Sequence, residues 1–121
     1  MVDTSILIDF YRKTDKSNTA WVSLVRQKYQ FAISAITKYE IYPGAIENQL
    51  EFWNNILQVI NVIPFNEACV DTAVTVNMIL KQKRSQIDIA DLFIAATALT
   101  NNLPFSTLNR KHFDRIPDLE L

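Results

Sequence analysis

Five short runs rich in apolar and β-branched residues are separated by longer stretches with helical periodicity, and this alternation limits the possible folds. The runs are Met1 to Asp3, Phe31 to Ser34, Val62 to Phe65, Leu103 to Thr107 and Leu119 to Leu121. Strands that alternate with helices form parallel sheets that helices cover on both faces. The sequence therefore predicts an α/β fold with a central, mostly parallel sheet of four to five strands.

Helical spacing of apolar residues predicts six helices between these runs. The first contains Leu7, Ile8 and Tyr11 and closes in Arg12 and Lys13, and the second is capped by Ser17 or Asn18 and reaches Lys28. The others are Thr37 to Ile46 with a kink or break at Pro43, Glu51 to Val59, a long helix capped by Asn66, and Ile87 to Thr100. Aromatic residues at helical spacing, including Trp21 and Trp53, are expected in the core.

The length of 121 residues supports one domain with one core. Hydrophobic residues make up 49% and charged residues 21%, as in globular proteins, and no apolar stretch approaches the roughly 20 residues of a membrane span. Cys69 is the single cysteine, so no intramolecular disulfide can form and a reducing compartment is the simplest assumption. We expect one domain over residues 1–121, located in the cytoplasm, with no membrane partner.

The single glycine, Gly44, excludes two common phosphate-binding designs. P-loops and dinucleotide-binding fingerprints both need several glycines where the backbone approaches phosphate. The formal net charge of −1 also argues against a protein whose whole surface binds nucleic acid. Local basic clusters, such as Arg110, Lys111 and Arg115, can be phosphate-binding patches or solvated helix ends.

Polar side chains with oxygen ligands lie where an α/β sheet places its chemistry, beyond the carboxyl ends of the strands. They are Asp3, Glu40, Asp91 and Asn109. Carboxylates without support from His or Cys suit a hard cation, and Mg²⁺ combines one or two carboxylates with water and a substrate phosphate. The pattern predicts a cluster of carboxylates within a few ångströms that holds Mg²⁺ for hydrolysis of a phosphodiester.

Other roles are open for several of these residues. Asp3 precedes a helix and could be its N-cap. Asp88 and Asp91 are spaced as an N-cap and its N3 partner, so Asp88 fits a cap better than a secondary metal ligand. Glu40 lies in an apolar stretch, where a Glu needs a partner, and we expect that partner to be the metal. His112, the single histidine, is expected to be packed or exposed rather than catalytic.

Four segments resemble PIN domains, in particular the VapC-type toxins of bacterial toxin–antitoxin pairs. They are Asp3 to Phe10, Ser34 to Glu40 with Gly44, Asp91 to Ala96, and Thr107 to Phe113. Their order and spacing match over the whole chain. The resemblance implies a PIN-like three-layer α/β/α sandwich and a metal-dependent ribonuclease whose substrate is RNA.

The resemblance also assigns roles to individual residues. Asp3, Glu40 and Asp91 fall on acidic positions that bind Mg²⁺ or Mn²⁺, and Thr4, Ser5 and Thr107 look like the polar residues that orient the metal's water or the phosphate. Asn109 falls where many members carry a fourth acid; its amide can coordinate through oxygen but adds no negative charge. Family members usually have a longer apolar run before the first Asp, so the first strand is short here or the reading frame begins upstream.

The resemblance further implies a homodimer and a cognate VapB-type antitoxin, whose C-terminal segment would place a basic side chain near the carboxylates. Two other functions are open. One is a catalytically weakened PIN domain that binds RNA or an antitoxin, suggested by Asn109. The other is a phosphatase for small esters, although Ser5 stands where such enzymes usually carry a second Asp.

Overall fold

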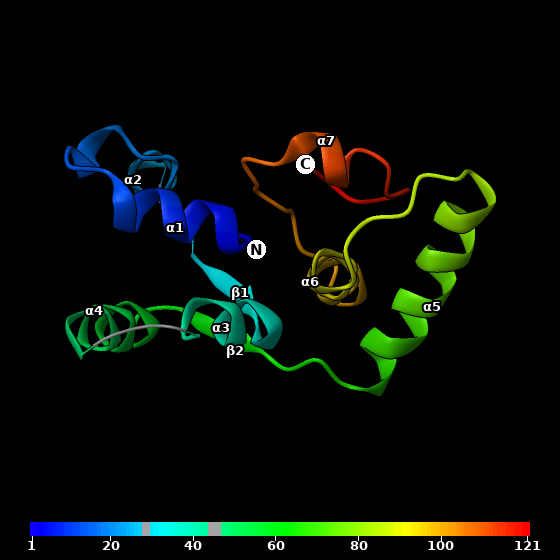
Figure 1. The fold of residues 1–121 in the computed structure, drawn as a ribbon, viewed down its shortest axis with the longest axis horizontal. Coiled ribbons are helices and arrows are strands. Elements are labelled where there is room, and N and C mark those ends of the chain that lie inside the picture. The colour runs from blue at the N-terminus through cyan, green and yellow to red at the C-terminus, as the bar shows by residue number, and fades with distance from the viewer. Residues whose placement is uncertain (28–29, 44–46) are drawn as a thin grey trace.

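The computed structural model describes residues 1–27, 30–43 and 47–121, and its elements follow the predicted alternation of helices and extended segments (Figure 1). The α-helices are α1 (Thr4–Arg12), α2 (Ala20–Arg26), α3 (Ala35–Ile41), α4 (Glu47–Leu57), α5 (Glu67–Gln82), α6 (Ile89–Thr100) and α7 (Arg110–Phe113), with a 3-10 helix η1 (Lys16–Asn18). Strands β1 (Ala32–Ser34) and β2 (Asn61–Ile63) pair in parallel, with Ile33 opposite Val62. The predicted α/β class with parallel pairing is confirmed.

Backbone hydrogen bonds continue this pairing beyond β1. Val2 N donates to Ala32 O at 3.0 Å, and a parallel bridge joins Val2 to Ser106. Phe105 N donates to Glu120 O at 2.7 Å, so the segment near the C-terminus lies along the same edge. In the described ranges only β1 and β2 are regular strands, and a sheet of four to five strands stays a prediction. Pro104 lacks an N–H, which limits regular pairing in the predicted strand Leu103 to Thr107.

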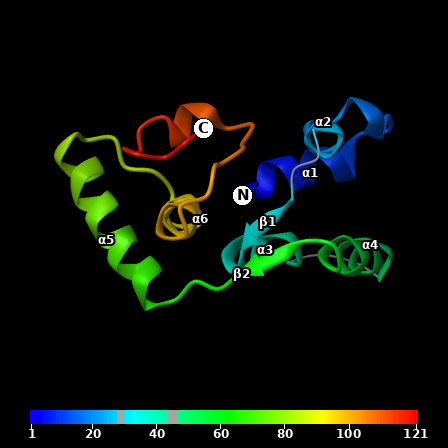
Figure 2. The same cartoon turned by 180° about the vertical axis from the view of Figure 1, so that it is seen from behind.

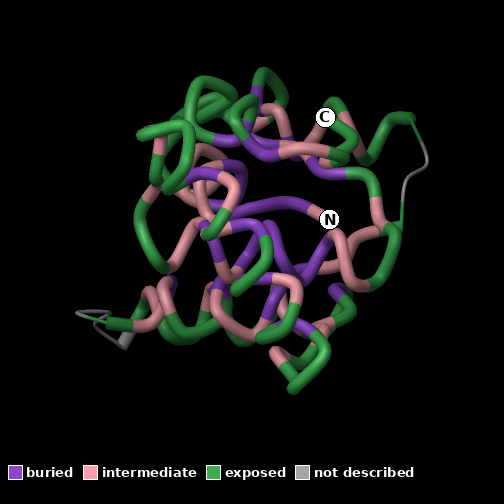
Figure 3. Tube along the Cα trace, turned by 90° about the vertical axis from the view of Figure 1, so that its right-hand side faces the viewer, coloured by how far each residue is buried: buried purple, intermediate pink, exposed green. Residues whose placement is uncertain are grey.

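Two clusters of buried apolar side chains form the core. One joins α5, α6 and α7, with Leu80, Ile94 and Phe113 completely buried. The other joins α1, α2, α4 and β1 and contains Trp21 and Trp53, as predicted. Figures 1 and 2 show α5 at one end of the molecule, α1, α2 and α4 toward the other, and α6 between them. In Figure 3 the buried segments run through the centre and the exposed ones surround them.

The ends of three helices can be compared with the caps and breaks that the sequence predicted. Asn66 caps α5 as predicted, because its side chain accepts from Cys69 N at 3.1 Å. The predicted cap of α2 is wrong: Thr19 Oγ1 accepts from Val22 N at 3.4 Å, while the Asp15 carboxylate holds Ser17 in η1. Helix α3 ends at Ile41, two residues before Pro43, as expected from the restriction that proline imposes on its neighbour.

Several residues to which the sequence analysis assigned a place lie outside the described residues. These are Lys28 at the end of the second helix, and Gly44 and Ile46 near the end of the third. Helix α4 begins at Glu47, four residues earlier than predicted, and α6 begins at Ile89, directly after Asp88. None of the helices in the described part of the chain has the length and apolar character to cross a membrane.

Candidate active site

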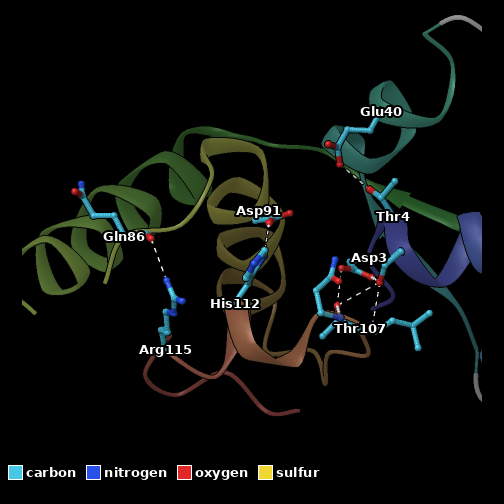
Figure 4. A network of polar contacts seen from close by, with 11 residues as sticks. Asp3, Thr4, Glu40, Gln86, Asp91, Thr107, His112 and Arg115 are labelled. Carbon is cyan, nitrogen blue, oxygen red and sulfur yellow. Dashed lines mark hydrogen bonds and ion pairs between the residues drawn. The ribbon is translucent and has the colours of Figure 1, made fainter. Parts of the chain in front are cut away.

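Asp3 is buried at the end of the first extended segment and is surrounded by hydroxyl groups. Its backbone N–H donates to Ser106 O at 3.1 Å, and its carboxylate accepts from Ser5 Oγ at 2.5 Å and from Thr107 Oγ1 at 2.7 Å (Figure 4). Burial raises the Asp3 pKa, and the bonds from Ser5 and Thr107 lower it by less. Asp3 occupies the N-cap position of α1, but its side chain makes no capping hydrogen bond. Its carboxylate lies between the first turn of α1, through Ser5, and residue Thr107.

The same hydroxyl groups hold the loop that follows residue 106. Thr107 Oγ1 accepts from Asn109 N at 2.9 Å, and Ser5 Oγ accepts from Leu108 N at 3.0 Å. The oxygens of Ser5 and Thr107 are 3.4 Å apart. Asp3, Ser5 and Thr107 therefore form one connected network that fixes the start of α1 against residues 107–109.

Glu40 is held by the first residue of α1. Thr4 Oγ1 donates to Glu40 Oε1 at 2.6 Å, which ties α1 to α3 (Figure 4). The sequence predicted a metal ion as the partner of this half-buried Glu, and within the chain its partner is Thr4. Asp3 and Thr4 are adjacent, so these contacts bring the carboxylates of Asp3 and Glu40 to the start of α1.

Asp91 lies in the first turn of α6, where His112 of α7 approaches it. His112 Nδ1 is 3.5 Å from Asp91 Oδ2, and Figure 4 shows the imidazole directed at this carboxylate. Burial raises the Asp91 pKa, the hydrogen bond from His112 lowers it, and the negative charges of Asp3 and Glu40 raise it further. The three predicted carboxylates therefore share one electrostatic environment, although they come from distant parts of the sequence.

Two other predicted residues lie at the edge of this environment. Asp88 occupies the N-cap position of α6, but its side chain makes no capping bond. The predicted capping box with Asp91 is wrong, because the Asp91 carboxylate contacts His112 instead. Asn109 is exposed at the N-cap position of α7, and its backbone N–H, rather than its amide side chain, connects it to Thr107.

The carboxylates are less tightly grouped than the sequence analysis expected. Within residues 1–27, 30–43 and 47–121, no three His, Cys, Asp or Glu side chains are close enough together to hold one ion. The available donors are nevertheless carboxylate oxygens, and Mg²⁺ typically binds one or two carboxylates and keeps several waters. A bound cation would also relieve the repulsion between the carboxylates of Asp3, Glu40 and Asp91, which raises the Asp91 pKa. This donor set fits a hydrated hard cation, Mg²⁺ or Mn²⁺.

Comparison with known proteins identifies the family. A family model described as "PIN domain" matches residues 1–119. This chain belongs to the PIN domain family. The PIN domain described here is 38% identical over 131 residues to "Ribonuclease VapC" of Rickettsia bellii, which covers 100% of this chain and 92% of the relative. It is 33% identical over 122 residues to "Ribonuclease VapC1" of Methanocaldococcus jannaschii, covering 100% of this chain and 83% of that relative.

Solved structures give the same result for this PIN domain. It matches a chain of VapBC2 from Rickettsia felis, solved with a DNA fragment from the promoter, with a TM-score of 0.87, 28% identity and coverage of 100% and 95% of the two chains. It matches a chain of VapBC-1 from nontypeable Haemophilus influenzae with a TM-score of 0.87, 27% identity and coverage of 99% and 93%. The resemblance drawn from the sequence is confirmed.

Sequence reasoning missed one residue of the PIN domain's site, His112. A lone histidine carries little information by itself, and the distance from His112 to Asp91 along the chain gives no local signal. The neighbouring residue offered a clue, because Phe113 is completely buried and fixes the short helix α7. Because His112 directly precedes the buried Phe113 and follows Thr107 by five positions, it lies at the same edge of the fold as Thr107.

Proposed function

We propose that this PIN domain is a metal-dependent endoribonuclease and the toxin of a toxin–antitoxin pair. The observation that carries the proposal is that the contacts of Thr4 with Glu40, and of Ser5 and Thr107 with Asp3, bring two carboxylates to the start of α1. The negative charges of both raise the pKa of the third, Asp91. Phosphodiester hydrolysis needs such a set of oxygen ligands to place a cation against the phosphate. Relatives named as ribonucleases align with the whole chain at 33–38% identity, which supports RNA as the substrate.

Asp3, Glu40 and Asp91 would hold Mg²⁺, or Mn²⁺ in its place, together with its bound waters. One or two of the carboxylates would bind the ion directly and the rest through a water, with Asn109 available as a neutral oxygen ligand. When bound, the cation lowers the pKa of a coordinated water and neutralises charge that develops on the phosphate. The chain's own hydroxyl groups orient the ligands: Ser5 and Thr107 hold Asp3, and Thr4 holds Glu40. Asp88, considered from the sequence as a secondary ligand, is left out because its charge is not among those that raise the Asp91 pKa.

Cleavage of a labelled RNA by variants of the carboxylates tests this proposal. Asp3→Asn and Asp91→Asn should each lower the rate about 100-fold or more, because loss of a metal ligand removes several kcal/mol of transition-state stabilisation. Asp71→Asn, which removes a charge from the exposed side of α5, is the matched control. Full activity of Asp3→Asn in the presence of Mg²⁺ would contradict the proposed site.

Two further assays separate the alternative functions. EDTA should abolish cleavage and added Mg²⁺ should restore it, whereas a weakened PIN domain that only binds RNA or an antitoxin would cleave under neither condition. A chromogenic phosphate ester should remain intact, because a phosphatase would hydrolyse it faster than RNA. The neutral Asn109 is the observation that keeps the weakened domain in consideration.

We also propose two protein partners. Solved structures similar to this chain include VapBC2 of Rickettsia felis and VapBC-1 of Haemophilus influenzae, which supports a VapB-type antitoxin. A homodimer is supported by an exposed apolar stripe on α5, formed by Val70, Val74 and Met78 at helical spacing, with 44%, 55% and 59% exposure. Light scattering should report a dimer for the wild-type chain and a monomer for Val74→Glu.

A further inference from the structure

A pocket that shares His112 with the carboxylate site is not used in the proposed hydrolysis. It is lined by Gln86, Ile87, Asp88, His112 and Arg115 and has a volume of about 280 Å³. Ligand pockets usually span about 300–1,000 Å³, so this one has room for a single planar ring system rather than a whole nucleotide. His112 belongs to both places, because its Nδ1 lies 3.5 Å from Asp91 Oδ2 while its side chain also lines the pocket. A group bound here would be next to a phosphate held at Asp91.

The pocket contains hydrogen-bond acceptors and hydrogen-bond donors that other described residues do not fully use. The Asp88 carboxylate is exposed and has no hydrogen bond or ion pair to any other described residue. Arg115 donates through Nη1 to Gln86 O at 3.3 Å, and its remaining N–H groups are available (Figure 4). Ile87 is half-buried and adds an apolar surface. The lining therefore combines an acceptor pair, a donor fork and a surface against which a flat ring can pack.

We infer that this pocket binds a guanine base of the substrate RNA, next to the bond that is cleaved. The N1–H and 2-amino groups of guanine lie side by side, so one carboxylate such as Asp88 can accept from both. Its O6 and N7 atoms are the acceptors that arginine contacts most often, which suits Arg115. Adenine, cytosine and uracil lack the paired donors, and a phosphate would be repelled by Asp88. The inference rests on the proposed ribonuclease function, because the base belongs to its substrate.

Substrate analogues that differ by one atom or group test the role of Asp88. A randomised RNA pool first locates the cleaved bond and the preferred neighbouring nucleotide. Labelled RNAs then carry guanine, inosine or adenine at that position. The wild-type chain should cleave the guanine RNA about tenfold faster than the adenine RNA or better, with inosine, which lacks the 2-amino group, between them. In Asp88→Asn the guanine and inosine RNAs should be cleaved at equal rates, and Asn preserves the N-cap position.

A second substrate analogue, 7-deazaguanine, tests the role of Arg115, and Asp71→Asn is the matched control for both variants. Replacement of guanine by 7-deazaguanine removes N7 and should slow the wild-type chain but not Arg115→Gln. Asp71→Asn, on the distant face of α5, should keep the full preference for guanine. An unchanged ratio of guanine to inosine cleavage in Asp88→Asn would overturn the assignment.

The remaining outcomes separate this inference from the proposed function. Cleavage without any base preference would overturn the guanine pocket and leave the ribonuclease in place. Failure of the wild-type chain to cleave any RNA would overturn both. Unchanged base preference together with weaker binding of a purified antitoxin by Asp88→Asn would assign the pocket to the antitoxin instead of to RNA.

Discussion

The hydroxyl group of Thr107 is central to the network around Asp3, and Thr107→Val isolates its contribution to stability. Thr107 Oγ1 donates to Asp3 Oδ2 at 2.7 Å and accepts from Asn109 N at 2.9 Å, and the residue is 8% exposed. Valine has nearly the same shape but lacks both bonds, as well as the longer contact of 3.4 Å with Ser5 Oγ. The buried Asp3 carboxylate would keep Ser5 as its remaining hydroxyl donor. The variant therefore measures the value of these bonds without opening a large cavity.

The expected loss can be built from the two bonds. A hydrogen bond to a charged group contributes roughly 1.5–3 kcal/mol, and a bond between neutral groups roughly 1 kcal/mol. The second value is an upper bound here, because Asn109 is exposed and water can replace Thr107 at its N–H. The free energy of unfolding should fall by about 2–3 kcal/mol, a large part of the roughly 5–15 kcal/mol typical of a domain. For a chain of this length the melting temperature should fall by roughly 8–12 °C.

Urea unfolding followed by circular dichroism, at pH 7.5 with EDTA, measures this loss. Thr75→Val is the control, because Thr75 Oγ1 donates to Asp71 O at 3.2 Å on the exposed face of α5 and should change stability by at most about 0.5 kcal/mol. In an Asp3→Asn background the cost of Thr107→Val should shrink, since the charged partner is gone. A Thr107→Val loss within 1 kcal/mol of the control would refute the reasoning.

Three further predictions concern charge and helix ends. Without metal, the raised pKa values of Asp3 and Asp91 stabilise the folded state at acidic pH. This contribution to the free energy of unfolding should be lost as the pH rises from about 4 through the raised pKa values. Urea titrations at several pH values measure it, and Asp91→Asn should make the free energy of unfolding depend less on pH. Mg²⁺ at about 100 times its Kd should raise the unfolding free energy by roughly 2.7 kcal/mol in calorimetry, and Asp3→Asn should abolish that response. Lys16→Met should cost about 1–2 kcal/mol in urea without loss of RNA cleavage, because Lys16 Nζ donates to Phe10 O at 2.7 Å and Tyr11 O at 3.1 Å at the end of α1.

The sequence predicted the features that depend on neighbours along the chain. The Asn66 cap, the burial of Trp21 and Trp53 and the extent of α6 follow from helical spacing and from side chains that bond within one turn. Such signals are local, so one sequence contains them completely. The error at the start of α2 also has a local origin. Serine is a better N-cap than threonine, which favoured Ser17 over Thr19, and the turn that the Asp15 carboxylate makes with Ser17 was not recognised.

The contacts that join distant segments could not be predicted in this way. Thr4 bonds Glu40 across 36 positions and Thr107 bonds Asp3 across 104, and no local pattern encodes either pair. Asp3 and Glu40 could be named because the ends of strands collect chemistry in this class of fold, and Thr4 and Thr107 because of the resemblance to PIN domains. His112 was missed for the same reason, since its approach to Asp91 depends on how α7 packs against α6.

The choice of partners for the carboxylates indicates how this site is prepared for a cation. Among the residues that the structure describes, Lys13 forms an ion pair with Asp9 and His112 contacts Asp91, whereas Asp3 and Glu40 are held by hydroxyl groups and by no Lys or Arg. A hydroxyl group fixes a carboxylate in place without cancelling its charge, whereas a lysine or arginine would neutralise it and compete with a metal. Burial keeps this uncompensated charge costly. The fold therefore stores an electrostatic cost that a ligand carrying positive charge relieves, which couples cation binding to stability.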